Sequence, residues 1–178
     1  PEAGKADLNT AEMQIIDAFL HDPSLPAGIA VDAGRRIAAA RRMGQPAPSV
    51  VALLPACARL GDAATAFERM FTVFTHGRGI DPQAMPAEQL KRLPFISTSD
   101  YQILTEPGPI HRLPLDDRRL AHLRSLLSDP RPVYTLRLSP EAGGAERVIS
   151  VYLTLERPHV RVISERQVVR AGIDLCGS

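Results

Sequence analysis

The chain has 178 residues, a formal net charge of +1 at pH 7, 44% hydrophobic residues and 23% charged residues. This apolar content excludes intrinsic disorder, and the length suffices for one buried core, with or without a small appendage. The near-zero charge argues against a protein that binds nucleic acid through bulk electrostatics. The sequence also lacks an unbroken apolar run of about 20 residues, so we expect no membrane-spanning helix.

The first part of the chain is predicted to be helical. Asn9 and Thr10 are candidate caps for a helix over 11–20, and His21-Asp22-Pro23 ends it because a residue before proline avoids helical geometry. Three further helical segments are expected over 30–43, 49–60 and 62–67.

After residue 68 the pattern becomes mixed. Strands are expected over 70–75, 95–99, 133–138, 148–155, 160–163 and 168–173, and helices over 86–93 and 116–128. Gly143-Gly144 suits a hairpin loop. The sequence therefore predicts an α+β protein, with a helical part over 1–68 and a second part over 69–178.

Three clusters of polar residues follow predicted strands. In the first, Gly77 and Gly79 allow close approach of the backbone to a ligand, while His76 and Arg78 add hydrogen-bond donors. An ordinary glycine-rich turn with a solvated arginine explains the same residues. Taken alone, this cluster favours the ordinary turn.

The second cluster is Ser97-Thr98-Ser99-Asp100-Tyr101. On the predicted strand, Ser97 and Ser99 share one face and Thr98 takes the other, so the two serines could hold a ribose. The third cluster contains Glu165 between two apolar segments, where a carboxylate could stabilise a developing positive charge. The structural alternative for the second cluster is a polar strand that ends in a turn. The alternative for the third cluster is a glutamate on the protein surface.

Taken in order, the three clusters resemble the ADP-ribosyltransferase superfamily. Arg78, Ser97-Thr98-Ser99 and Glu165 match the order of the toxin-like arginine–serine–glutamate class, over roughly 70–173. His76-Gly77, with Tyr101, is similar to the poly(ADP-ribose) polymerase-like class. This mixture is similar to the CteC-type bacterial effectors, which modify a threonine of ubiquitin and rely on an Asp–Glu pair.

The resemblance implies a split-sheet transferase core over 69–178, preceded by a helical subdomain for target docking or structural support. NAD would be the substrate and no metal is expected. Glu165 and Asp100 would be catalytic, with Asp81 as the second choice for the aspartate. The residues expected to bind NAD are His76, Gly77, Arg78, Ser97, Thr98, Ser99 and Tyr101.

The implied partner is a host protein, with ubiquitin as the specific case, modified so that ubiquitination is blocked. The resemblance further implies a monomeric, secreted bacterial effector acting in the host cytoplasm, with Arg35, Arg36, Arg41 and Arg42 as docking candidates. One departure from the family pattern is Gln167, which competes with Glu165 for the catalytic place. An NAD glycohydrolase and an inactive binding module on the same fold stay open as alternatives.

Overall fold

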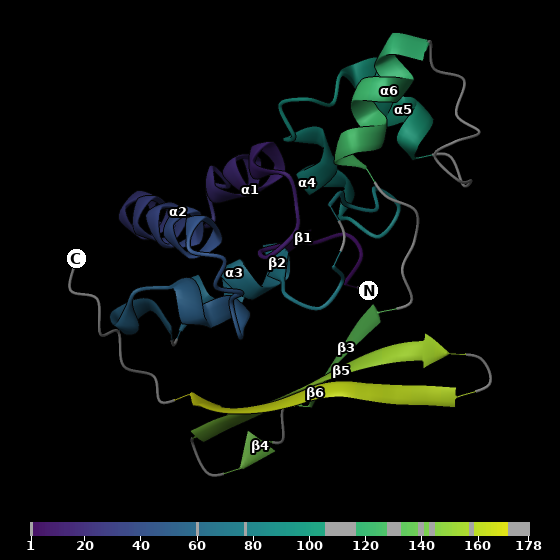
Figure 1. Cartoon of the computed structure of the whole chain (residues 1–178). Helices are drawn as coiled ribbons and strands as arrows, with labels where there is room; N and C mark the ends of the chain where they lie inside the picture. Colours follow the sequence, from purple (N-terminus) through teal and green to yellow (C-terminus); the bar gives the residue numbers. More distant parts are fainter. Residues whose placement is uncertain are drawn as a thin grey trace.

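The computed structural model describes residues 2–59, 61–76, 78–105, 117–127, 133–138, 141–142, 145–156 and 159–170. Its α-helices are α1 (Met13–Leu20), α2 (Ala27–Arg42), α3 (Asp62–Met70), α4 (Ala87–Lys91), α5 (Thr98–Leu104) and α6 (Asp117–Leu126), and its 3-10 helices are η1 (Val50–Leu53) and η2 (Ala56–Arg59). The strands are β1 (Ala6–Asp7), β2 (Phe71–Thr72), β3 (Val133–Leu138), β4 (Glu141–Ala142), β5 (Ala145–Glu156) and β6 (His159–Arg170). The α+β class is confirmed (Figure 1).

The helical front part is confirmed with changed boundaries. The segment 49–60 forms two 3-10 helices instead of one α-helix, with Pro55 between them. The predicted caps of α1 are wrong, because its N-cap is Glu12, without a side-chain hydrogen bond. Asn9 instead binds a distant segment: its Oδ1 accepts a hydrogen bond of 2.7 Å from the backbone N–H of Ala47.

Two short strands join the first residues of the chain to the segment after α3. β1 pairs in parallel with β2, with Ala6 opposite Phe71 and Asp7 opposite Thr72. The ring of Phe71 lies 5.8 Å from that of Phe19 in α1 and 4.4 Å from that of Phe67 in α3, measured between centroids. The predicted boundary near residue 68 thus falls within α3, inside one continuous hydrophobic core.

The remaining strands form a four-stranded antiparallel sheet. β5 pairs with β3, β4 and β6. The predicted hairpin loop 143–144 lies outside the described residues. β3 has the predicted bounds. The predicted strand 160–163 and residues 168–170 of the last predicted strand belong to one continuous strand, β6, whose register shifts opposite Tyr152 and Leu153. Residues 171–173 lie outside the described residues. Figure 1 shows β5 and β6 running side by side below the helices.

Two predicted strands near the site are wrong or shortened. The segment 95–99 is not a strand, since α5 begins at Thr98 with Ser97 as its N-cap. The strand expected over 70–75 is reduced to Phe71–Thr72. Both segments are rich in β-branched and aromatic residues, which favour strands. This preference is weak, and hydrogen bonds from side chains, such as the helix cap at Ser97, prevail over it.

Candidate functional site

The loop after β2, which carries the first predicted cluster, is anchored by a buried carboxylate. Asp7 in β1 is 0% exposed. Its Oδ2 accepts a hydrogen bond of 2.8 Å from the backbone N–H of His76 and one of 3.2 Å from the hydroxyl of Thr75. Its Oδ1 accepts another, of 2.9 Å, from the N–H of Asn9. Asp7 therefore fixes the start of this loop.

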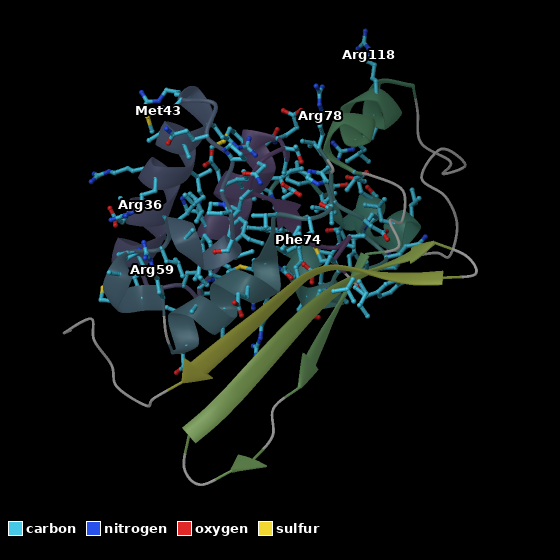
Figure 2. The ribbon with its side chains drawn as sticks, turned by 60° about the horizontal axis from the view of Figure 1, so that its bottom comes forward. Arg36, Met43, Arg59, Phe74, Arg78 and Arg118 are labelled. Carbon is cyan, nitrogen blue, oxygen red and sulfur yellow. The ribbon has the colours of Figure 1, made fainter. Side chains whose placement is uncertain are left out.

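His76 adopts a backbone conformation that is uncommon for a residue with a side chain. Its φ is +50°, in the left-handed region, and its side chain is exposed. Such a conformation carries local strain, which the bond to Asp7 helps to hold. Arg78 is also exposed and projects outward in Figure 2. Gly77 lies outside the described residues.

Gly79 brings the loop close to another part of the chain. A Cβ at this position would lie 2.6 Å from the backbone carbon of Leu127 and 2.8 Å from the backbone oxygen of Leu126. The next residue, Ile80, donates a backbone hydrogen bond of 3.1 Å to that oxygen. Gly79 thus allows a close approach to the backbone at the end of α6, and its predicted approach to a ligand stays a prediction.

The serine cluster begins a helix. The hydroxyl of Ser97 accepts a hydrogen bond of 3.2 Å from the N–H of Asp100, while Asp100 Oδ2 accepts one of 2.8 Å from the N–H of Ser97. These reciprocal bonds form a capping box. The Ser97 hydroxyl also donates to Asp100 Oδ2 at 2.5 Å, so the proton in its 2.9 Å contact with Ser99 comes from Ser99. The two serines are together, as predicted, but on a helix end.

Asp100 forms a second set of contacts with α6. It is 3% exposed, and its carboxylate forms a two-point ion pair with the guanidinium of Arg119, whose Nε donates to Oδ1 at 3.0 Å. Arg119 Nη2 also donates to the backbone oxygen of Phe95 at 3.2 Å. Paired guanidinium–carboxylate contacts fix orientation as well as charge. Asp100 therefore joins α5 to α6 and holds the hydroxyl of Ser97.

A cavity of about 240 Å³ lies beside this helix end. It is lined by Lys91, Ile96, Ser97, Thr98 and Tyr101. The ammonium of Lys91 lies 5.1 Å from the centre of the Tyr101 ring and donates a hydrogen bond of 2.9 Å to Glu88. The hydrogen bond to Glu88, followed by the charges of Glu88 and Tyr101, raises the pKa of Lys91. One cation and three residues that carry hydroxyl groups thus line a space that an anionic or sugar-like group could occupy.

α6 connects the first two predicted clusters. Arg119, near its start, contacts Asp100, and Leu126, at its end, contacts the loop through Ile80. Seven residues of helix separate these contacts by about 10 Å. The sequence analysis did not identify Asp7 or Arg119, although the Ser97-x-x-Asp100 spacing is itself a helix-start pattern. Nothing in the local sequence identifies Asp7 or Arg119 as the partners.

The late carboxylate cluster lies in the four-stranded sheet. The backbone of Glu165 pairs with Val151, and that of Gln167 with Ile149. The side chains of Glu165 and Gln167 lie outside the described part of the chain. Asp81, the alternative for the catalytic aspartate, is 4% exposed, and its Oδ1 accepts a hydrogen bond of 3.0 Å from the N–H of Gln83.

The four docking candidates on α2 differ in their contacts. Arg41 donates to the backbone oxygens of Asp7, Leu8 and Ala11 at 3.3, 2.9 and 2.7 Å, and its burial lowers its pKa. Its guanidinium thus stabilises the turn between β1 and α1. Arg36 forms an ion pair of 3.1 Å with Asp32, and it projects outward in Figure 2.

Comparisons with protein-family models, with curated proteins and with solved structures find no match to this chain. Within the described ranges, no group of three His, Cys, Asp or Glu side chains is placed to hold a metal ion. No helix in the described part of the chain has the length and apolar character needed to cross a bilayer.

Proposed function

We propose that the protein is a mono-ADP-ribosyltransferase that transfers ADP-ribose from NAD to a side chain of a host protein, with a threonine of ubiquitin as the acceptor. Such a modification would block ubiquitination. The proposal rests on the order of Arg78, Ser97-Thr98-Ser99 and Glu165 along the chain. The observation that supports it best is that α6 contacts both of the first two clusters, which are about 20 residues apart in sequence.

In the proposed reaction, the bond between the nicotinamide and the ribose breaks and nicotinamide leaves. The ribose carbon then carries positive charge, as in glycoside hydrolysis, and a carboxylate close to it lowers the barrier. We assign this role to Glu165. The oxygen of the acceptor hydroxyl forms the new bond to that carbon, and its proton passes to water.

The contacts of Asp100 change its role in the proposal. Sequence analysis assigns it the proton of the acceptor, but its oxygens already accept hydrogen bonds from Ser97 and Arg119. We propose instead that Asp100 is a positioning residue that acts through the hydroxyl of Ser97. Ser97, Thr98 and Lys91 would then bind polar groups of NAD in the adjoining cavity.

The proposal is tested by incubating the protein with biotin-labelled NAD and purified ubiquitin, then mapping labelled peptides by mass spectrometry. We expect one labelled threonine, and loss of labelling by about 100-fold or more in Glu165→Gln, since one electrostatic contact in a transition state has that magnitude. Glu146→Gln, on the neighbouring strand β5, is the matched control and should keep full labelling.

Two results would contradict this assignment. Release of free ADP-ribose without labelled protein, in ubiquitin or in a eukaryotic lysate, identifies an NAD glycohydrolase. Absence of NAD binding by calorimetry identifies an inactive module. The variant Gln167→Glu separates the two candidate positions, because it should increase labelling only if Gln167, rather than Glu165, occupies the catalytic place.

A further inference from the structure

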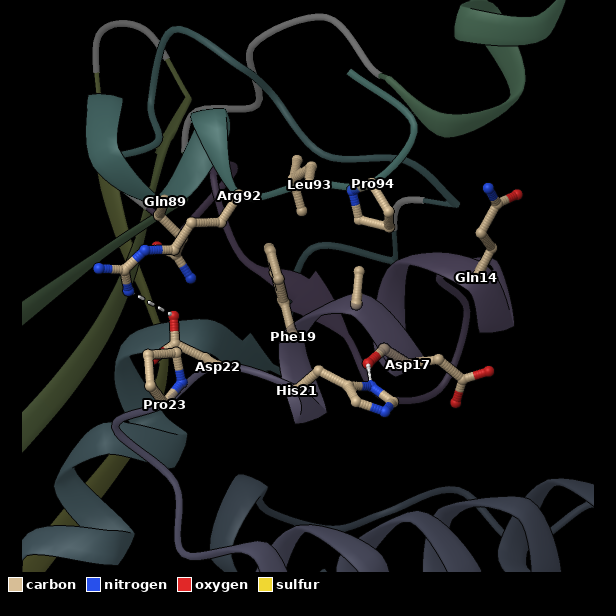
Figure 3. A pocket seen from close by; sticks show the side chains of 11 residues that line it. Gln14, Asp17, Phe19, His21, Asp22, Pro23, Gln89, Arg92, Leu93 and Pro94 are labelled. Carbon is tan, nitrogen blue, oxygen red and sulfur yellow. Dashed lines mark hydrogen bonds and ion pairs between the residues drawn. The ribbon is translucent and has the colours of Figure 1, made fainter. Parts of the chain in front are cut away.

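A second cavity, of about 580 Å³, lies between α1 and the segment that follows α4 (Figure 3). Its volume is within the range of small-molecule sites, which is about 300–1,000 Å³. Its central surface is apolar and includes Phe19, Leu93 and Pro94. Phe19 and Leu93 are 2% and 3% exposed, so the apolar bottom of the cavity is formed by side chains that belong to the packed core. None of its lining residues belongs to the clusters assigned to NAD above.

One end of this cavity presents a cation. Arg92 forms an ion pair of 3.4 Å with Asp22, shown by a dashed line in Figure 3. Asp22 is held on its other side by the N–H and hydroxyl of Ser24, at 2.9 and 2.6 Å. The Arg92 side chain is 57% exposed, and one of its five N–H donors is directed to Asp22. The other donors suit a carboxylate or phosphate group of a ligand.

The opposite end presents hydrogen-bond acceptors. Figure 3 shows Gln14 and Asp17 on the side of the cavity away from Arg92, with Phe19 between. Within the described residues, the carboxylate of Asp17 accepts no hydrogen bond and forms no ion pair. His21 Nδ1 lies 2.6 Å from the backbone oxygen of Asp17, which can only accept, so Nδ1 donates this hydrogen bond.

We propose that this cavity binds a small zwitterion in which a cationic amine and a carboxylate are separated by an apolar ring. The amine would contact Asp17 and the neighbouring acceptors, the ring would lie on Phe19 and Leu93, and the carboxylate would contact Arg92. Figure 3 shows Phe19 between Arg92 and Asp17, so the apolar ring of the ligand would lie between its two charged groups. This site does not depend on the proposed transferase activity.

The probe is 4-(aminomethyl)benzoate, which carries both charges at pH 7. Benzylamine lacks the carboxylate and 4-methylbenzoate lacks the amine. The full chain is titrated with each compound and binding is measured by calorimetry. The dissociation constant of the zwitterion should be at least about tenfold lower than that of either analogue, because one hydrogen bond to a charged group contributes about that factor to affinity. Equal affinity for all three compounds, or no binding of the zwitterion, would overturn the proposal.

Two variants test the two ends separately. Asp17→Asn should remove the advantage of the zwitterion over 4-methylbenzoate, and Arg92→Gln should remove its advantage over benzylamine. Both residues are exposed, so both variants should keep the fold, which circular dichroism checks. Asp32→Asn and Arg35→Gln, on α2, are the matched controls and should bind all three compounds as the wild type does. Variants at the cavity that bind like these controls would refute the site.

Discussion

The side chain of Asp7 accepts a hydrogen bond of 2.8 Å from the backbone N–H of His76, 69 positions later in the chain. This contact joins the first strand to the loop that carries the first candidate cluster. Because Asp7 is fully buried and His76 has a positive φ, the carboxylate both satisfies a backbone donor and holds a strained conformation.

Asp7→Asn keeps the size of the side chain but replaces one acceptor oxygen by an amide group that donates. We expect the free energy of unfolding to fall by about 1–3 kcal/mol, as for other buried groups that lose a charged hydrogen-bond acceptor. Urea denaturation followed by circular dichroism measures this change. Asp62→Asn, at the start of α3, is the control, and its free energy of unfolding should fall by less. An unchanged urea midpoint for Asp7→Asn would show that the loop does not need this anchor.

Gly79→Ala should destabilise the protein by about 1–3 kcal/mol, because the added Cβ would meet the backbone of Leu126 and Leu127, which cannot move as a side-chain end can. Gly28→Ala is the matched control. A Cβ at Gly28 would have no atom within 4 Å, and alanine is the better helix former, so this variant should be neutral or slightly stabilising. Thermal denaturation of both variants provides the comparison, and an unaltered Tm in Gly79→Ala would contradict the close contact with α6.

Ser97→Ala should lower the free energy of unfolding by about 1 kcal/mol, since it removes the side-chain half of the capping box of α5. Ser99→Ala removes a hydroxyl two residues away that does not cap the helix. This variant should lower the free energy of unfolding by less than Ser97→Ala. Chemical denaturation distinguishes the two. If the segment 95–99 were a strand, as its composition suggests, the two serines would be equivalent and the two variants would lose similar stability.

The hydrogen bonds of Asp22 with Ser24 and its ion pair with Arg92 predict that the stability of the protein depends on pH in the acidic range. Partial burial raises the pKa of Asp22, but the hydrogen bonds from Ser24 and the charge of Arg92 outweigh it and lower the pKa below the usual value of 3.8. A lowered pKa in the folded state means that this stabilisation is present above pH 3.8 and is lost as the pH falls through the folded-state value.

Asp22→Asn should therefore be less stable than the wild type at pH 7, and the difference should shrink as the pH falls below about 4. Thermal denaturation at a series of pH values between 7 and 2 measures both curves, with Asp62→Asn as the control. Parallel curves for the wild type and Asp22→Asn over the whole series would show that Asp22 contributes no such stabilisation.

Local pattern was enough to predict several elements. The apolar spacing of α6 and the alternation of β3 lie within a single segment, so their existence and approximate bounds follow from the sequence. The helical character of the segment before residue 68 follows in the same way. At residues 95–99 the β-branched composition indicated a strand, and the signal that prevails is the spacing of Ser97 and Asp100, which caps a helix.

The α+β class, the elements with strong periodicity and the order of the three polar clusters along the chain all follow from local patterns of amino acids. The contacts of Asp7 with His76, of Arg119 with Asp100, and of Gly79 with the end of α6 arise only when the chain folds. These contacts join residues that are 19 to 69 positions apart. Since local spacing carries no information about such partners, packing of the core selects them.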